Sequence, residues 1–378
     1  VHLGGDLRVL KRLVGHDMTP VAGRIADGEE EGHVAFGGRR PSRFAPRVPV
    51  HRVVGVLAEI RAALAGQKVH RPDPTDDQST SGDRPHWQTP GVRRWILGAR
   101  PRTLPAAIVP VLVGTAVAAG TGVVWWRAAA ALVVALALQV AVNYANDLSD
   151  GLRGTDGPER VGPARLVGGG LATPEEVRTA MLLAFALASV AGLTLAAAVT
   201  PWLLVVGAAS VAAGWFYTGG SRPYGYRGLG EVFVFAFFGL VATVGSTYVH
   251  QQRMPGLAWL AAVAVGFLAC SLLVVNNLRD RVGDEEGGKR TLAVRLGDRR
   301  TRLLYVALLD GSLVVGSLCA LSRPWAALVL IAGLMAGPSV RRVLAGAEGP
   351  DLVDVLVRTG KIQMAAGALL ALGLALSA

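Results

Sequence analysis

The sequence predicts an all-α, polytopic membrane protein, and three observations support this fold class. First, 52% of the 378 residues are hydrophobic, a share above that of most soluble globular chains. Second, these residues gather into runs long enough to cross a bilayer as helices. Third, the basic residues are concentrated in alternate loops between the runs, as they are in membrane proteins with one side in the cytoplasm.

Nine apolar runs predict about nine transmembrane helices. They lie near residues 104–119, 126–143, 178–199, 202–217, 231–249, 257–275, 303–321, 325–340 and 360–377. Most have the length that a helix needs to cross the hydrocarbon core of a bilayer. We therefore expect residues 93–378 to form one transmembrane domain.

Residues 1–92 differ in composition from the rest of the chain. They are charged and rich in Pro, Gly and Arg, residues 70–83 have the composition of a linker, and residues 53–66 predict one short amphipathic helix. Since such a segment buries little apolar surface, we expect a disordered N-terminal extension. It lacks the apolar segment and small-residue cleavage site of a signal peptide. The first methionine is Met18, which raises the hypothesis that the natural start lies further downstream.

The distribution of basic residues predicts the orientation in the membrane. The loops after the second, fourth, sixth and eighth predicted helices contain 17 Lys and Arg residues, whereas the loops after the first, third, fifth and seventh contain 3. Cytoplasmic loops carry the excess of basic residues. The N-terminus is therefore expected in the cytoplasm and the C-terminus outside.

Composition also excludes several classes of function. The net charge of +11 is explained by the basic cytoplasmic loops, so we do not expect nucleic-acid binding. Cys270 and Cys319 lie inside apolar runs, where thiols behave as small hydrophobic groups, and they predict neither a disulfide nor a metal framework. Six of the seven histidines precede residue 90, which leaves His250 alone in the membrane domain and argues against a haem protein or a histidine-based catalyst.

A polar cluster follows the apolar run 128–142. If the helix of that run continues, Asn143, Asp147 and Asp150 fall at i, i+4 and i+7, on one helical face. Two carboxylates are then expected to converge at the membrane boundary.

A second polar cluster follows the apolar run 257–275 in the same way. Asn276, Asp280 and Asp284 stand on one helical stripe. Both clusters belong to loops on the predicted cytoplasmic side, so we expect the two acidic helix ends to face each other.

Four carboxylates near lipid need a compensating cation, because adjacent carboxylates repel each other and are costly to dehydrate. Hard oxygen ligands suit Mg²⁺, which takes one or two carboxylates and completes its coordination with water and phosphate oxygens. We interpret the paired clusters as a Mg²⁺-diphosphate site. A single acid of this kind is more simply explained as a helix-cap or loop residue at a solvated helix end. The non-enzyme alternative for the whole set is a cation transporter, which predicts carboxylates in broken helices at mid-membrane.

Two basic stretches lie on the same predicted side as the clusters. A Gly-rich loop at residues 217–231 contains Arg222 and Arg227, and residues 288–297 follow the second cluster. Guanidinium groups bind oxyanions with two parallel hydrogen bonds, so these stretches can hold phosphate or an anionic ring. Ordinary basic residues of cytoplasmic loops would give the same pattern.

Four sequence blocks then carry a family resemblance. They are residues 99–105, residues 146–156 followed by 160–163, residues 222–226, and residues 288–297. In content and order they resemble the UbiA-type intramembrane prenyltransferases, and within them the 1,4-dihydroxy-2-naphthoate polyprenyltransferase (MenA) subfamily. The resemblance covers roughly residues 95–378, and the N-terminal extension lies outside it.

The resemblance implies a helical bundle around a central cavity in a bacterial-type cell membrane, with its active site facing the cytoplasm. It implies transfer of a polyprenyl chain from polyprenyl diphosphate to 1,4-dihydroxy-2-naphthoate, with loss of CO₂ and diphosphate, giving demethylmenaquinone for menaquinone biosynthesis. The cofactor would be Mg²⁺, and the partners would be these two substrates and the lipid bilayer. The alternative within the family is another aromatic acceptor, such as 4-hydroxybenzoate or homogentisate.

The resemblance also implies roles for individual residues. Asp147, Asp150, Asp280 and Asp284 would be the catalytic metal ligands, with Asp156 as a further acid displaced from the family spacing, which would place it at Gly154. Neutral oxygen ligands or orienting groups would be Asn143, Asn146 and Asn277, and the cations holding diphosphate or carboxylate would be Arg222, Arg279 and Lys289. Tyr217, Tyr224 and Tyr226 would flank the allylic cation with their ring faces.

Overall fold

A computed structural model describes residues 91–154 and 164–378. These residues form helices and turns without strands, which confirms the all-α prediction. The expectations for the N-terminal extension and for Asp156 concern residues outside these ranges.

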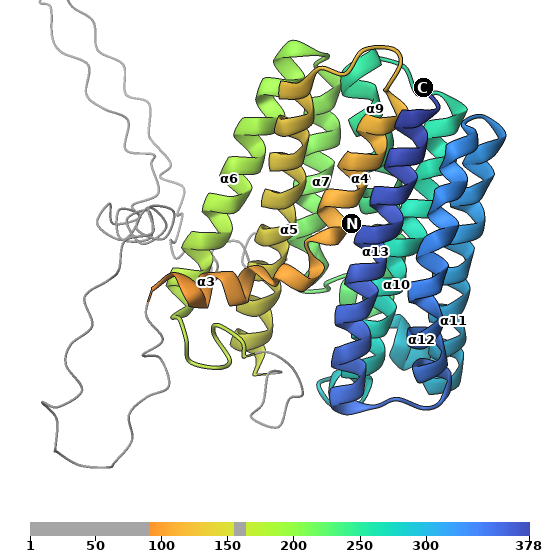
Figure 1. The fold of residues 1–378 in the computed structure, drawn as a ribbon. Helices are drawn as coiled ribbons and strands as arrows, with labels where there is room; N and C mark the ends of the chain where they lie inside the picture. Colours follow the sequence, from red (N-terminus) through yellow and green to blue (C-terminus); the bar gives the residue numbers. More distant parts are fainter. Residues whose placement is uncertain (1–90, 155–163) are drawn as a thin grey trace, which may run out of the picture. The chain divides into compact units, whose positions relative to one another are not determined.

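The helices follow one another through short connections (Figure 1). In chain order they are α3 (Val92–Ala99), η1 (Pro101–Thr103), α4 (Pro105–Val117), α5 (Trp125–Arg153), α6 (Pro174–Ala198), α7 (Trp202–Thr218), η2 (Gly225–Arg227), α8 (Gly230–Val234), the π-helical η3 (Phe235–Val241), α9 (Ala242–Gln251), α10 (Gly256–Glu286), α11 (Leu292–Leu318), η4 (Cys319–Leu321), η5 (Pro324–Ala332), α12 (Gly333–Leu344) and α13 (Gly349–Leu376).

Every predicted apolar run overlaps a helix, but the count of nine spans is not confirmed. Within the described ranges, seven helices are long and apolar enough to cross a membrane. An eighth span is formed if the segments Val92–Thr103 and Pro105–Val117, which meet at a bend of 56°, count together. Helix α7 is a shorter apolar helix. The polytopic membrane class predicted from the sequence is confirmed, and the orientation of the N-terminus stays a prediction.

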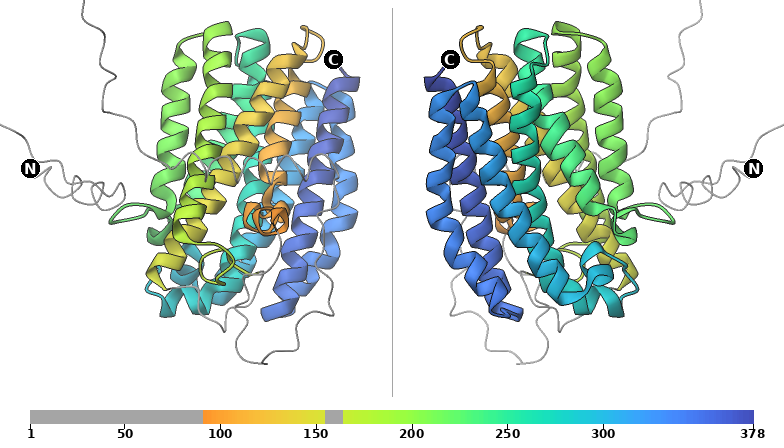
Figure 2. Two further views of the ribbon diagram at one scale, coloured as in Figure 1. Left: turned by 90° about the vertical axis from the view of Figure 1, so that its left-hand side faces the viewer. Right: turned by 90° about the vertical axis from the view of Figure 1, so that its right-hand side faces the viewer.

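Two groups of helices lie on either side of the bundle. Helices α5, α6 and α7 lie together on one side and α11 to α13 on the other, with α4, α9 and α10 between them (Figures 1 and 2). Helix α10 is the most enclosed of the candidate membrane spans, with 72% of its most apolar stretch buried. It contacts α11, α13 and η3, so it is the central helix of the domain.

Glycines permit the closest helix contacts around α10. A Cβ placed on Gly239 of η3 would lie 2.6 Å from the Cα of Gly266 on α10, a separation that the backbones tolerate only without a side chain. Small residues at such crossings are a common device in membrane bundles, because lipid supplies no hydrophobic force to press helices together. The wide turn of η3 is thereby packed directly on the central helix.

Local signals define where the helices carrying polar residues begin and end. Helix α6 starts with a capping box, in which the Thr173 side chain accepts from Glu176 N and the Glu176 side chain accepts from Thr173 N. Helix α5 ends at Arg153 and is capped by Gly154, whose φ of 67° is readily adopted by glycine. The α5 helix therefore continues well past its apolar run, as the sequence analysis expected.

Candidate active site

The first polar cluster lies on one buried face of α5. Asn143, Asp147 and Asp150 are 3%, 1% and 4% exposed, and all three belong to the continuous helix Trp125–Arg153. The predicted i, i+4, i+7 stripe is confirmed. Its three members nevertheless contact different partners.

Asp147 binds the backbone of the segment that precedes α6. Its Oδ2 accepts from Leu166 N and its Oδ1 from Val167 N, each at 2.9 Å. Both carboxylate oxygens thus fix this segment against α5, an arrangement that the sequence analysis did not foresee. A role of Asp147 as metal ligand stays a prediction.

Asn143 holds the turn between α3 and α4. Its Nδ2 donates to the Ala99 carbonyl oxygen at 2.8 Å and to Thr103 Oγ1 at 3.2 Å. Between these partners lies Arg100, whose φ of 52° places it in the left-handed region. The amide of Asn143 therefore supports the strained turn that carries Arg100 to the cavity described below.

Lys289 joins the two acidic clusters. Its Nζ lies 2.9 Å from Asp150 Oδ1 on α5 and 3.6 Å from Asp284 Oδ1 on α10, so both carboxylates are close enough to share one small cation. Tyr226 also donates its hydroxyl hydrogen to Asp150 Oδ1, and Arg165 Nη2 lies 3.9 Å from Asp150 Oδ2. The expectation that the two acidic helix ends face each other is confirmed.

The chain path explains how Lys289 reaches both acids. After α10 the backbone folds back, with Lys289 N donating to the Asp284 carbonyl oxygen at 2.7 Å and Arg290 N to that of Tyr226 at 2.9 Å. Gly288 makes this turn possible with a φ of 74°. The basic stretch 288–297 is thus placed beside the clusters by backbone hydrogen bonds.

Charge and burial set the ionisation of the residues in these loops. Burial lowers the pKa of Lys289, but the Asp150, Tyr226 and Asp284 groups outweigh it and raise this pKa above its ordinary value. Burial and the charge of Asp150 raise the pKa of Tyr226, against the smaller effects of Lys289 and Arg153. At neutral pH Lys289 is therefore a cation and Tyr226 a neutral hydrogen-bond donor.

The second cluster contains a tight charge pair. Arg279 donates through Nε to Asp280 Oδ1 at 2.8 Å and through Nη2 to Asp280 Oδ2 at 2.6 Å, and Nη2 also contacts Asn276 Oδ1 at 3.0 Å. The Arg279 side chain is 4% exposed and that of Asp280 is 17% exposed. Arg279 thus neutralises Asp280, and its proposed role toward a substrate anion stays a prediction.

Asn277 leads to a buried acid that the sequence analysis missed. Its Nδ2 donates to Glu231 Oε1 at 3.0 Å, and Glu231 is 8% exposed at the start of α8. A single acid at the edge of an apolar run has no recognisable motif. Its position beside α10 could be found only from the folded chain.

The Gly-rich loop contributes tyrosines more directly than arginines. Tyr217 packs edge-on against Tyr224 with ring centroids 5.5 Å apart, and Tyr224 stacks on Phe233 at 3.9 Å. Burial raises the pKa of Tyr224, so its hydroxyl stays neutral. Arg222 is exposed and has no hydrogen bond or ion pair with any described residue, so its predicted anion-binding role rests on the sequence alone.

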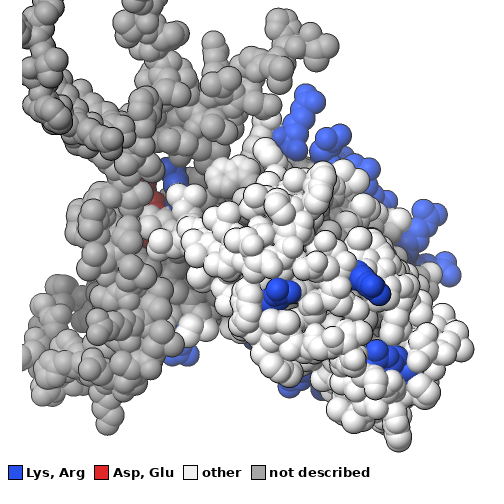
Figure 3. Space-filling model, turned by 90° about the horizontal axis from the view of Figure 1, so that it is seen from above, with Lys and Arg blue, Asp and Glu red and all other residues white. Residues whose placement is uncertain are grey.

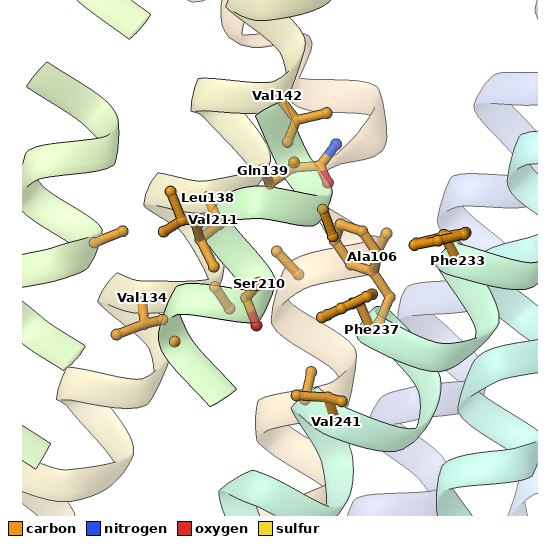
Figure 4. A pocket seen from close by; sticks show the side chains of 18 of the residues that line it. Ala106, Val134, Leu138, Gln139, Val142, Ser210, Val211, Phe233, Phe237 and Val241 are labelled. Carbon is orange, nitrogen blue, oxygen red and sulfur yellow. The ribbon is translucent and has the colours of Figure 1, made fainter. Parts of the chain in front are cut away.

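An apolar cavity of about 800 Å³ opens beside the two clusters. Arg100, Asn143, Asn146 and Asn276 line its polar end, and the rest of the wall is mostly aliphatic and aromatic. Figure 4 shows Val142 and Gln139 toward one end of the cavity, Phe233 and Phe237 further along its wall, and Val241 toward the other end. This arrangement fits an amphipathic ligand with a charged head at the clusters and a long apolar tail.

The donor set around the polar end suits a hard divalent cation. Carboxylates of Asp150 and Asp284 and the amide oxygens of Asn146 and Asn276 are all oxygen donors of the kind that Mg²⁺ prefers. Among the described residues, no three His, Cys, Asp or Glu side chains gather into one group able to hold a metal. One or two carboxylates are sufficient for Mg²⁺ when phosphate and water supply the remaining oxygens.

Fold and site together define a class: a polytopic helical membrane protein in which two acidic helix ends meet at a lysine, beside an apolar cavity lined by Asn143, Asn146 and Asn276. The chain belongs to the UbiA prenyltransferase family, whose model matches residues 107–351. This confirms the family resemblance deduced from the sequence. A UbiA homolog from Archaeoglobus fulgidus, solved with GPP and Mg²⁺ bound, has the same fold with a TM-score of 0.54 at 15% identity, covering 73% of this chain and 99% of that one.

Curated relatives are more similar to this chain in sequence than that solved structure is. The 1,4-dihydroxy-2-naphthoate octaprenyltransferase of Mycobacterium tuberculosis is 52% identical over 71% of this chain and 91% of its own length. The enzyme of the same name from Escherichia coli is 37% identical over 75% of this chain and 95% of its own length. The matches cover nearly the whole length of both relatives, so similarity is not confined to one motif.

Proposed function

We propose that the protein transfers a polyprenyl group from polyprenyl diphosphate to 1,4-dihydroxy-2-naphthoate, with Mg²⁺ as cofactor. The observation that supports this most strongly is the 52% identity to the mycobacterial octaprenyltransferase over 91% of that enzyme. The cavity beside the clusters supports it independently, because it accommodates an apolar chain whose anionic head lies near cations. The proposed product belongs to menaquinone biosynthesis.

The proposed reaction is balanced without a redox step. The C–O bond between the allylic carbon of the donor and its diphosphate breaks, and the electron pair leaves with diphosphate. A ring carbon of the naphthoate forms the new C–C bond to that allylic carbon, and the ring loses its carboxyl group as CO₂. The released prenylated naphthalenediol is demethylmenaquinone in its reduced form.

The residues of the site would bind and orient the donor. Asp150 and Asp284, with Asp280 nearby on α10, would hold Mg²⁺, and the amide oxygens of Asn146 and Asn276 would supplement them. Bound Mg²⁺ would stabilise negative charge on the departing diphosphate. Lys289 carries a positive charge between the carboxylates and can bind a diphosphate oxygen as a point charge.

The cavity walls would protect the reacting carbon from water. Tyr217, Tyr224 and Phe233 form a contiguous row of rings in the cavity lining. Ring faces attract a cation, and an apolar enclosure limits its hydrolysis. The chain beyond the first isoprene units would extend along the aliphatic part of the cavity.

We further propose that the clusters face the cytoplasm. Figure 3 shows the bundle from the end opposite the clusters, where the described surface is mostly uncharged, with isolated Lys and Arg side chains on it and several more gathered along one edge. The loops at the cluster end carry most of the basic residues of the membrane domain, and such loops normally stay in the cytoplasm. A cysteine introduced at exposed Arg222 tests this orientation. In inverted vesicles, whose cytoplasmic face points outward, a membrane-impermeant thiol reagent should label it.

A direct assay tests the proposed function. Membranes containing the protein are incubated with 1,4-dihydroxy-2-naphthoate, octaprenyl diphosphate and Mg²⁺, and the product is identified by mass spectrometry. The expected product mass reflects gain of the polyprenyl group and loss of CO₂. Parallel reactions with 4-hydroxybenzoate and homogentisate test the alternative acceptors, and a product from either but not from dihydroxynaphthoate would overturn the proposal.

The cavity predicts sensitivity to chain length. Val241 lies on the cavity wall away from Gln139 (Figure 4), so Val241→Trp should obstruct a long tail and leave room for a short one. We expect about a 10-fold loss of kcat/KM with octaprenyl diphosphate, and a clearly smaller loss with geranyl diphosphate. Val232→Trp is the matched control, since Val232 is 61% exposed on the same helical segment. Equal losses with both donors would contradict this placement of the tail.

A further inference from the structure

Glu231 is a buried acid of the membrane domain to which the proposed reaction gives no role. It is 8% exposed, and its Oε2 lacks a hydrogen-bond partner within the described ranges. Burying a carboxylate in a membrane protein is costly, and such residues usually serve function. The surroundings of Glu231 indicate which function it serves.

Helix α10 fixes Glu231 at two points. The Cys270 thiol donates to the Glu231 carbonyl oxygen at 3.2 Å, and Asn277 Nδ2 donates to Glu231 Oε1 at 3.0 Å. Cys270 and Asn277 are seven residues apart, about two helical turns, and so lie on one stripe of α10. Both the main chain and the side chain of Glu231 are therefore held against this stripe.

The same stripe continues into the second acidic cluster. Asp280 and Asp284 follow Asn277 at i+3 and i+7 on α10, so the three side chains share one face. A carboxylate accepts hydrogen bonds and donates none when ionised. Contact with Glu231 therefore fixes the Nδ2 end of the Asn277 amide toward α8 and leaves Oδ1 as the end free to face another ligand.

We propose that Glu231 is a positioning residue, which orients Asn277 so that its amide oxygen serves the cation of the diphosphate site. The proposal rests on the function proposed above, because it takes the second cluster as part of that site. Groups that orient a metal ligand through a hydrogen bond typically change metal affinity by about 10–100-fold when removed. Glu231 acts through Asn277 and contacts no substrate.

Metal affinity measured directly tests this role. Purified protein is titrated with Mn²⁺ in the presence of a non-reactive geranyl thiodiphosphate, and free Mn²⁺ is followed by electron paramagnetic resonance. Glu231→Leu should weaken Mn²⁺ binding by about 10–100-fold. Glu231→Gln keeps a carbonyl oxygen that accepts from Asn277, so its Mn²⁺ affinity should stay close to that of the wild type.

A double-mutant cycle separates positioning from general disruption. If Glu231 acts through Asn277, the double variant Glu231→Leu/Asn277→Leu should bind Mn²⁺ no more weakly than Asn277→Leu alone. If the loss of Mn²⁺ affinity in the double variant equals the product of the losses in the two single variants, the two residues act independently. Where Glu231→Leu does not purify as a folded protein, Glu231→Asp replaces it, because its shorter side chain withdraws the carboxylate from Asn277.

The outcomes distinguish this inference from the function on which it rests. Wild-type protein that binds no Mn²⁺ with the diphosphate analogue would overturn the metal site and the positioning role together. Binding by the wild type with an unchanged affinity in Glu231→Leu would overturn the positioning role alone. A loss in Glu231→Gln as large as that in Glu231→Leu would also overturn it, since the charge and not the hydrogen bond would then matter.

Discussion

Replacing Asp150 by Asn is expected to lower prenyl transfer by about 10²–10³-fold, the loss usual when a group that stabilises developing charge is removed. Asp150 is 4% exposed, and its carboxylate contacts Tyr226 of η2 and Lys289, which follows α10. The substitution keeps the shape of the side chain and removes its negative charge. Turnover is measured with octaprenyl diphosphate and dihydroxynaphthoate over a range of Mg²⁺ concentrations.

The control for this variant is Asp351→Asn. Asp351 is exposed in the first turn of α13, so its loss should leave transfer close to wild type. Membrane insertion of Asp150→Asn, checked by detergent extraction and gel filtration, should be unchanged. Near-normal turnover in Asp150→Asn would remove the main support for a metal site at these helix ends.

Lys289→Met is expected to damage both stability and activity. The lysine side chain is 12% exposed and lies within 4 Å of Asp150 and Asp284, and its removal leaves two neighbouring carboxylates without that cation. Loss of one partner from a buried charge network costs about 3–5 kcal/mol, and we expect a loss near the lower bound because the lysine retains some solvent contact. Added Mg²⁺ should recover part of the stability, since it neutralises the same acids.

The sign of the pH dependence follows from the raised pKa of Lys289. Because the pKa of Lys289 is raised in the folded protein, the charged lysine stabilises the fold fully below its ordinary pKa of 10.5. This contribution is lost on the alkaline side as pH rises through the pKa of the folded state. The difference in thermal stability between wild type and Lys289→Met should therefore persist as pH rises above neutral and shrink in strongly alkaline solution, and on the acid side it should shrink as the neighbouring carboxylates become protonated. Lys361→Met, at an exposed lysine of α13, serves as control, and an equal destabilisation by both substitutions would contradict the bridging role.

The convergence of the acidic clusters was predictable from the sequence. Helical periodicity placed Asp147 and Asp150 on one face, and the alternation of loops placed Asp284 at the same end of the domain. Helical periodicity and the alternation of loops are regular features, so they can be followed along the sequence without the structure. The family resemblance rested on four sequence blocks, one of which, residues 146–156, contains Asp147 and Asp150.

The partners of the acids were not predictable, because they come from irregular backbone. Both oxygens of Asp147 accept from the amides of Leu166 and Val167, and every residue type except proline can offer a backbone amide. Lys289 was one of several cations near the clusters, and only the turn at Gly288 selects it. The single acid Glu231 gave no pattern at all.

The predicted count of nine membrane spans is not confirmed within the described ranges, and the reason is geometric. Apolar composition alone does not distinguish a full crossing from a short helix such as α7, or from the bent pair that meets at 56° near Pro105. At that bend Arg100 adopts a left-handed conformation and Pro101 begins η1. Backbone preferences of this kind end helices without lowering hydropathy.

The bridge from Asp150 to Lys289 also bears on how the enzyme is assembled in the cell. One partner is at the end of α5 and the other follows α10, so a nascent chain inserts four further apolar helical segments, Pro174–Ala198, Trp202–Thr218, Gly230–Gln251 and Gly256–Glu286, before the acid meets its lysine. Until then Asp150 lacks its lysine partner at the membrane surface. Chains truncated before Lys289 should consequently be degraded by membrane quality-control proteases faster than the full-length chain.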